Sequence, residues 1–210
     1  MKKILLIDDH AVVRDGVKKM LDQQHRSISF GEAGSVAEAI NLVHRQNWDL
    51  GILDLSLGDR SGLDVLKELK HIRRRMPILV LTMHSEEQYA RRAFKAGASG
   101  YITKDSTGEE LINAVNKVMS GGRYVSPSLA ERLVVGLASD LDKPLHESLS
   151  DREFEVMCLI ASGKTVGEIA ELLSLSDRTI STYRARILEK MVMRTNAELT
   201  HYAIQNKVVD

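Results

Sequence analysis

Five short apolar segments alternate with longer segments of helical periodicity from residue 3 to about residue 120, and this alternation constrains the fold more than any other feature. The apolar segments predict β-strands at 3–7, 27–33, 50–55, 78–82 and 99–103. Between them, apolar residues recur at helical spacing, as at Leu63, Leu66 and Leu69. Strands that alternate with helices predict a parallel sheet covered by helices on both faces, with the apolar strands in buried positions.

Expected helix starts in this first region carry a capping pattern, in which Ser or Thr is followed three residues later by Glu or Gln. The pattern occurs at Ser35-x-x-Glu38, Ser85-x-x-Gln88 and Thr107-x-x-Glu110. The five strands and their helices predict one compact domain.

The pattern changes after Gly122. A short helix is predicted within 126–139, and the polar, proline-containing segment 140–148 is typical of a linker. Beyond it the chain has no strand signal, and capping residues and apolar spacing predict four helices, at 150–161, 165–173, 176–191 and from about 196. We therefore predict three regions, namely 1–121, 122–147 and 148–210.

Overall charge and cysteine content say little about function. The chain has 29 Lys or Arg and 29 Asp or Glu, so any sign of binding to nucleic acid or membrane must be local. No apolar run approaches the roughly 18 to 20 residues that span a bilayer. The apolar run after Met1-Lys2-Lys3 is too short for the core of a signal sequence and lacks a small-residue cleavage site, so we expect none. The sequence predicts a cytoplasmic protein without membrane contact, in which the single Cys158 fills the core.

Polar residues gather at the carboxyl ends of the predicted strands. Asp8 and Asp9 follow the first strand, Asp54 ends the third, Thr82 ends the fourth and Lys104 follows the fifth. In a doubly wound sheet, ligands bind beyond these strand ends. Two adjacent carboxylates repel each other, and a divalent ion such as Mg²⁺ between them and Asp54 would relieve the repulsion.

This set of residues suits phosphoryl transfer. A carboxylate can act as a nucleophile toward phosphorus, and the charge on the phosphoryl oxygens needs a cation and hydrogen-bond donors. Asp54 is the predicted nucleophile, Asp8 and Asp9 are left for Mg²⁺, and Lys104 and Thr82 would bind the phosphoryl oxygens. Carboxylates also gather at strand ends as helix caps, which is the alternative for any one residue taken alone.

Residues 165–191 predict a helix, a short turn and a second helix. Ile169, Leu172 and Leu175 would face Ile180, Ile187 and Met191, which fits a helix-turn-helix. The residues of the second helix that point away from this face are Arg178, Ser181, Thr182, Ala185 and Arg186.

Charge within the C-terminal region is unevenly distributed. Residues 148–210 hold eight Lys or Arg against nine Asp or Glu, a net charge of −1, but 178–194 hold five basic residues against Glu189 alone. We predict base contacts from Arg178, Ser181 and Thr182. The predicted phosphate contacts are Lys164, Thr165, Thr179, Arg186 and Lys190. A solvated amphipathic helix with a basic face is the alternative.

Two sets of motifs resemble known families. IDDH, LDLSLGDRSGLDVL, ILVLTMHSE and GYITKD resemble the receiver domain of bacterial two-component response regulators. LSDREFEVMCLIASGKTVGEIAELLSLSDRTISTYRARILEKM resembles the LuxR-type helix-turn-helix, and together they are similar to the NarL/FixJ subfamily. The resemblance implies an α/β, flavodoxin-like, five-stranded receiver domain followed by an all-α helix-turn-helix domain of four helices.

The resemblance also implies roles for individual residues. Asp54 would be the phosphoacceptor, and Mg²⁺ would be held by Asp8, Asp9, Asp54 and the backbone carbonyl of Ser56. Thr82 and Lys104 would bind the phosphoryl group. Tyr101 would be the switch residue, filling space that Thr82 vacates when it moves toward the phosphoryl group.

Partners follow from the same resemblance. A sensor histidine kinase would phosphorylate the receiver domain, and the helix-turn-helix would read the major groove of double-stranded DNA at palindromic half-sites. These half-sites would require a homodimer, formed through the apolar strip of the last helix, Leu199, Tyr202, Ala203 and Ile204. Packing of that strip into the core is the alternative.

Three positions depart from the receiver pattern. Gly58 and Asp105 stand where such domains often have proline, and Met83 stands where many have a small residue. The receiver fold leads us to expect a cis peptide bond between Lys104 and Asp105, although without proline this costs about 3 kcal/mol or more.

We therefore predict a transcriptional regulator, not an enzyme, that phosphorylation of Asp54 switches, with dimerisation as its result. One alternative is an aspartyl-phosphate hydrolase of the haloacid-dehalogenase type, but Ser56 stands where such enzymes need a second acid. Another alternative is a DNA-binding regulator whose receiver domain is an interaction module independent of phosphorylation.

Overall fold

The computed structural model describes residues 1–24, 28–57, 60–84, 86–127, 129–131 and 144–209. The chain divides into two compact units, Met1–Ala130 and Glu131–Asp210. Each unit has its own set of buried apolar side chains.

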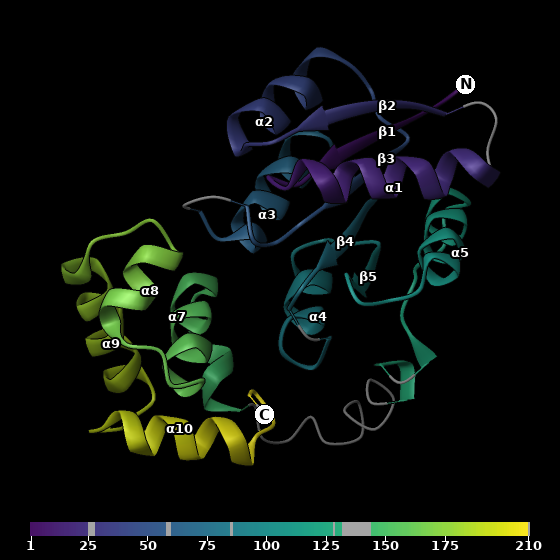
Figure 1. Cartoon of the computed structure of the whole chain (residues 1–210). Coiled ribbons are helices and arrows are strands. Elements are labelled where there is room, and N and C mark those ends of the chain that lie inside the picture. Colours follow the sequence, from purple (N-terminus) through teal and green to yellow (C-terminus); the bar gives the residue numbers. More distant parts are fainter. Residues whose placement is uncertain (25–27, 58–59, 85, 128, 132–143, 210) are drawn as a thin grey trace. The chain divides into compact units, whose positions relative to one another are not determined.

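The first unit is built on a parallel sheet of five strands in the order β2-β1-β3-β4-β5 (Figure 1). The strands are β1 (Lys2–Ile7), β2 (Ile28–Ala33), β3 (Leu50–Leu53), β4 (Ile78–Thr82) and β5 (Gly100–Thr103). Strand order reverses between β1 and β3, which is where doubly wound sheets bind ligands. The predicted parallel sheet is confirmed, and each strand lies where the apolar segments predicted it within a few residues.

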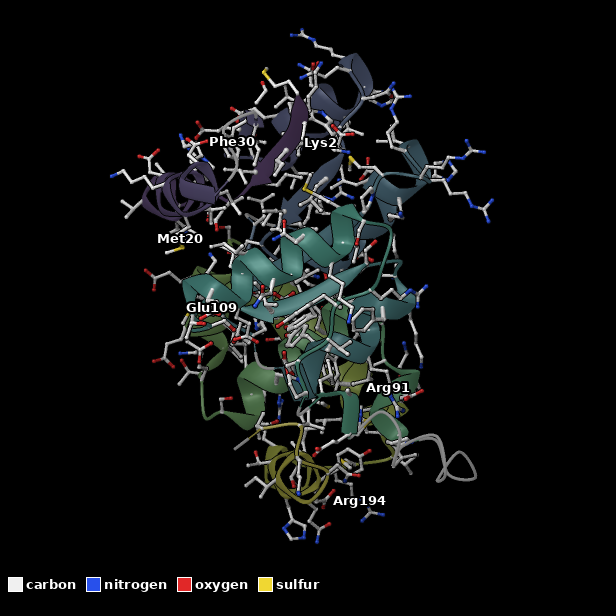
Figure 2. All side chains as sticks on the ribbon, turned by 90° about the vertical axis from the view of Figure 1, so that its right-hand side faces the viewer. Lys2, Met20, Phe30, Arg91, Glu109 and Arg194 are labelled. Atoms are coloured by element: carbon white, nitrogen blue, oxygen red, sulfur yellow. The ribbon has the colours of Figure 1, made fainter. Side chains whose placement is uncertain are left out.

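Four helices connect the strands, and a fifth follows β5. They are α1 (Ala11–Gln24), α2 (Val36–Arg45), α3 (Gly62–Ile72), α4 (Glu86–Lys95) and α5 (Gly108–Met119). Helices α1 and α5 share one face, where Val17, Leu21, Leu111 and Val115 pack with Ile4 and other strand residues in one buried cluster. Figure 2 looks onto α5 and labels Met20 of α1 and Glu109 of α5 on these two helices.

Hydrogen bonds at the helix starts bear out two of the capping predictions. The Ser35 hydroxyl accepts from the backbone N–H of Glu38, and the Thr107 hydroxyl accepts from that of Glu110. The carboxylate of Glu38 accepts in turn from the N–H of Gly34. The third pattern begins at Ser85, which lies outside the described residues.

After α5 the chain turns at Gly121, whose φ of 89° favours glycine. It then runs beside the outer edge of β5. The N–H of Tyr124 donates to Ser99 O (3.0 Å), and the N–H of Tyr101 donates to Tyr124 O (3.3 Å). The chain is helical at residues 127 and 129–131. The rest of the helix predicted within 126–139, from 132 onward, lies outside the described residues.

Among residues 144–209, the second unit contains a short 3₁₀ helix, η1 (Leu145–Ser148), and four α-helices. These are α7 (Asp151–Ala161), α8 (Val166–Leu172), α9 (Asp177–Lys190) and α10 (Asn196–Gln205), as the sequence predicted. Reciprocal capping boxes start α7 at Ser150 and α8 at Thr165. Helix α7 packs against α9 and α10, and α8 packs against α9 (Figure 1).

The apolar contact between α8 and α9 differs in one residue from the prediction. Ile169, Ile180, Ile187 and Met191 are buried as expected, but Leu172 is 58 % exposed. Leu173, at the C-cap of α8, is buried in its place. The prediction for Leu172 was wrong because the buried face of α8 consists of Ile169, Ala170 and Leu173. At 3.6 residues per turn, Leu172 points about 100° away from the centre of that face.

Among the described residues, every helix is too short or too polar to cross a lipid bilayer.

Candidate functional site

The polar residues predicted at the strand ends lie together at the carboxyl edge of the sheet. Backbone hydrogen bonds fix their positions: Asp8 N donates to Ala33 O (3.1 Å), Asp54 N to Ile7 O (2.9 Å), and Lys104 N to Thr82 O (2.8 Å). Each side chain is therefore presented by a strand that is itself held by its neighbour.

The ammonium group of Lys104 lies between two carboxylates. Its Nζ is 2.6 Å from Asp54 Oδ2 and 2.7 Å from Asp8 Oδ2, and the side chain of Asp54 is only 1 % exposed. Burial lowers the pKa of Lys104, but the hydrogen bonds to Asp54 and Asp8 outweigh it and leave that pKa above its ordinary value. Lys104 thus supplies the positive charge that the adjacent carboxylates require.

Asp9 and His10 lie beside Asp8 and Asp54 and complete a cluster of three carboxylates and one imidazole. His10 Nδ1 lies 2.7 Å from Asp9 Oδ1 and 3.2 Å from Asp8 Oδ1. One ligand atom from each of Asp8, Asp9, His10 and Asp54 falls within 4.8 Å of the others. Three carboxylates are a donor set that suits a small hard cation such as Mg²⁺, so the residues present fit the predicted ion.

Ser56 and His84 form a second polar contact next to Asp54. The Ser56 N–H donates to Asp54 Oδ1 (3.0 Å), and Ser56 Oγ lies 3.3 Å from His84 Nε2. Burial lowers the pKa of His84, although the charge of Asp54 acts in the opposite direction. Sequence reasoning missed His10 and His84, although both stand within two residues of predicted site positions.

Thr82 and Tyr101 are joined through the backbone of His84. The Thr82 hydroxyl accepts from the N–H of His84 (3.5 Å), and the Tyr101 hydroxyl donates to the carbonyl of His84 (2.9 Å). Both side chains are fully buried. Burial raises the pKa of the Tyr101 phenol well above its ordinary value. In this structure the Tyr101 side chain is thus in the interior, and the Thr82 hydroxyl is hydrogen-bonded to His84.

The three departures from the receiver pattern have different outcomes. The side chain of Met83 is 71 % exposed. The described residues contain no cis peptide bond, so the cis bond expected at Lys104–Asp105 was wrong. Without proline the trans form is favoured by about 3 kcal/mol. Gly58 lies outside the described residues.

Helix α9 presents polar side chains away from the core of the second unit. Arg178, Ser181, Thr182 and Arg186 are all exposed. A shallow hollow on this helix is lined by Arg178, Thr179, Thr182, Tyr183 and Arg186. Two arginines, hydroxyls and a phenol provide the donors that phosphate groups and base edges accept. Tyr183 was absent from the predicted DNA contacts, which were limited to charged residues and small hydroxyls.

Two other predicted DNA contacts, Lys190 and Thr165, have partners within the unit. Lys190 Nζ lies 2.6 Å from Glu153 Oε2, and the side chain of Glu153 is only 5 % exposed. The Thr165 hydroxyl donates to Glu168 Oε2 (2.7 Å) at the start of α8, and Lys164 precedes it on the surface. These pairs compete with any contact that Lys190 and Thr165 make to phosphate.

The apolar strip of α10 is divided between core and surface. Leu199 and Ala203 are fully buried, whereas Ile204 is 53 % exposed. The hydroxyl of Tyr202 lies 3.0 Å from His146 Nδ1 of η1. Leu199 and Ala203 are therefore used in packing within the unit. Of the apolar strip, Ile204 remains exposed on the surface of α10.

Comparison with known families matches both units. The model of the response regulator receiver domain matches residues 4–116, and that of bacterial regulatory proteins of the luxR family matches residues 147–203. The chain is similar to Response regulator UvrY of Escherichia coli, with 31 % identity over 98 % of this chain and 95 % of that protein. It is similar to Response regulator GacA of Pseudomonas aeruginosa, with 32 % identity over 100 % of this chain and 99 % of that protein.

Solved structures give the same result. RcsB from Salmonella enterica serovar Typhimurium, bound to promoter rprA in the presence of phosphomimetic BeF3−, has a TM-score of 0.65 and 25 % identity, covering 96 % of this chain and 97 % of that one. A LuxR-family two-component response regulator from Aurantimonas sp. SI85-9A1 has a TM-score of 0.59 and 31 % identity, covering 65 % and 97 %.

Proposed function

The chain belongs to the two-component response regulators that join a receiver domain to a luxR-family DNA-binding domain, and we propose that phosphorylation of Asp54 switches it. The observation that carries the proposal is the position of Lys104 between Asp54 and Asp8 at the carboxyl edge of the sheet. A buried carboxylate with an ammonium group beside it is both a nucleophile and a binding site for the oxygens of a phosphoryl group.

In the proposed reaction, a carboxylate oxygen of Asp54 attacks the phosphorus of a phosphohistidine on a sensor histidine kinase. A P–O bond to Asp54 forms and the P–N bond breaks, so the imidazole of the kinase leaves with its electron pair and takes up a proton. Lys104 donates to the phosphoryl oxygens, and the Thr82 hydroxyl turns to donate to them as well. The Ser56 N–H holds the second oxygen of Asp54.

Asp8, Asp9, Asp54 and the carbonyl of Ser56 would hold Mg²⁺. When bound, the ion would neutralise negative charge on the phosphoryl oxygens and on the carboxylates. Lys104 and the ion would then each neutralise part of the negative charge of the carboxylate cluster.

The output of the switch is binding to double-stranded DNA. Helix α9 would enter the major groove, with Arg178, Ser181 and Thr182 at base edges. Lys164, Thr165, Thr179, Arg186 and Lys190 would contact phosphates. Phosphorylation would favour a homodimer that reads palindromic half-sites, with residues 1–121 as the receiver domain, 122–147 as the linker and 148–210 as the DNA-binding domain.

Intact-mass spectrometry tests the proposal. The full chain is incubated with Mg²⁺ and acetyl phosphate, beside a sample with EDTA and an Asp54→Asn variant. We expect the mass of one phosphoryl group to be added only with Mg²⁺ and only when Asp54 is present. No added phosphoryl group, with an authentic histidine kinase also failing, would show that the cluster is structural.

A further inference from the structure

The segment that leaves the receiver domain contacts Tyr101 and also Glu86, which lies two residues after His84. Its first contact is with Tyr101 itself, because the N–H of Tyr101 donates to the carbonyl of Tyr124 (3.3 Å). The approach is close: a Cβ added at Gly100 would lie 3.1 Å from Tyr124 Cβ and 2.8 Å from Leu79 Cδ1. A residue with a side chain at position 100 would push Tyr124 away from β5.

A second contact reaches the first residue of α4. The hydroxyl of Ser126 donates to Glu86 Oε2 at 2.5 Å. Glu86 follows His84 by two residues, and His84 bonds to Thr82 through its N–H and to Tyr101 through its carbonyl. The segment therefore touches the switch residues on both sides, at Tyr101 and just after His84.

Ser126 also begins the helical turn that leads into the linker. Its hydroxyl accepts from the N–H of Leu129 (3.1 Å), and its carbonyl accepts from the N–H of Ala130 (2.9 Å). One hydroxyl thus joins the start of α4 to the helical residues 127 and 129–131. If Glu86 moves away while this hydroxyl stays in place, the hydrogen bond between them breaks.

We propose that residues 122–126, here called the exit segment, act as a latch that carries the state of the phosphorylation site to the part of the linker that follows Ser126. This inference rests on the proposed phosphorylation of Asp54. When Thr82 turns toward the phosphoryl group, the N–H of His84 loses its acceptor and the segment that includes Glu86 shifts. The bond between Glu86 and Ser126 then breaks, and the exit segment is released from the edge of β5.

Substitutions can separate the bond between Ser126 and Glu86 from the bond by which Ser126 caps the helical turn at Leu129. Ser126→Asp keeps a strong N-cap acceptor for Leu129 but removes the donor and places a second carboxylate against Glu86. Glu86→Ala removes the acceptor and leaves the cap intact. In the double variant Glu86→Gln/Ser126→Asp, the glutamine amide donates to the new carboxylate, which restores the bond with its direction reversed. Ser35→Asp, at the N-cap of α2, is the matched control.

The measurement is amide hydrogen exchange of peptides from residues 122–131 in the full chain, with and without Mg²⁺ and beryllofluoride or acetyl phosphate. We expect phosphorylation to speed exchange about tenfold in the unsubstituted protein, the factor that corresponds to losing one charge-assisted hydrogen bond. Ser126→Asp and Glu86→Ala should exchange at the faster rate without phosphorylation. The double variant and Ser35→Asp should behave like the unsubstituted protein.

Intact mass, measured on the same samples, separates the two proposals. If Asp54 gains no phosphoryl group, the proposed function fails, and the latch fails with it. If Asp54 is phosphorylated but exchange of residues 122–131 stays constant, the latch alone is overturned. Slow exchange in both Ser126→Asp and Glu86→Ala would also overturn it.

Discussion

Lys104 donates to Asp54 over a distance of 2.6 Å, and the same ammonium group neutralises Asp8. The three groups form a compact arrangement of one cation and two carboxylates with little exposure to water. Removing the cation would leave two buried negative charges within the cluster, a situation that proteins tolerate poorly.

We therefore predict that Lys104→Met lowers the free energy of unfolding of the receiver unit by about 3 kcal/mol in EDTA, because it leaves buried charges unpaired. Mg²⁺ should recover much of this loss, since the ion can replace the missing charge. Thermal unfolding with and without Mg²⁺ measures both effects through Trp48, the single tryptophan. Lys67→Met, on the exposed face of α3, is the control. Equal Mg²⁺ effects on all three proteins would contradict a shared carboxylate site.

The pair formed by Glu153 and Lys190 predicts a pH dependence of the second unit. Burial raises the pKa of Glu153, but hydrogen bonds from Lys190 and Ser150 outweigh it and hold that pKa below its ordinary value of 4.5. The ionised carboxylate thus stabilises the folded unit above pH 4.5. This stabilisation is lost as the pH falls through the lowered pKa.

The test is calorimetric unfolding of the full chain between pH 3 and 6. Glu153→Gln should flatten the loss of stability on acidification, because glutamine keeps the capping box but carries no titrating group. Glu171→Gln removes an exposed carboxylate from the neighbouring helix α8 and serves as the control. An unchanged acid profile in Glu153→Gln would mean that this carboxylate has the same pKa in the folded and unfolded chain.

The same pair predicts unequal contributions of two basic residues to DNA binding. Arg186 is exposed on α9, whereas Lys190 must leave a buried carboxylate in order to reach a phosphate. On a mixed-sequence duplex, Arg186→Ala should reduce the slope of log affinity against log salt by about 1. Lys190→Ala should reduce it by clearly less. Fluorescence anisotropy across a salt series distinguishes the two, and the opposite order would show that Lys190 exchanges partners freely.

Val192 follows α9 in the left-handed region, with φ of 56°, and is 87 % exposed. A β-branched residue is strained there, and exposure means that little packing offsets the strain. We predict that Val192→Gly stabilises the second unit by about 1 kcal/mol. Val12→Gly, at the 84 % exposed Val12 of α1, should instead destabilise its helix. Calorimetry of both variants compares the same substitution in two backbone conformations.

Much of the fold could be predicted, because buried parallel strands appear as continuous apolar segments and helices impose a period of about 3.6 residues on the sequence. The convergence of Asp8, Asp54 and Lys104 followed from the parallel sheet alone. The outward face of α9 followed from helical geometry in the same way. In both cases the regular backbone determines which way a side chain points, so the position of a residue within its strand or helix is enough to place its side chain.

The features that sequence reasoning missed depend on side chains and on contacts without a local pattern. Lys104 and Lys190 have long side chains that can reach several carboxylates. The sequence does not show that Lys104 lies between Asp54 and Asp8, or that Lys190 pairs with Glu153. The exit segment has too few residues to show strand periodicity, and its bonds to Ser99, Tyr101 and Glu86 join it to residues more than twenty positions away. Leu172 and Leu173 both stand at helical spacing from Ile169, and packing against α9 decides which of the two is buried.

The exit segment has a practical consequence for anyone who isolates the receiver domain. It occupies backbone donors and acceptors along β5, which would otherwise be an open edge. An open edge strand is a template on which another chain can add a strand, and proteins usually shield such edges. A fragment cut at residue 121 would expose this template and tend to aggregate, whereas a fragment cut after Ala130 would keep its own shield.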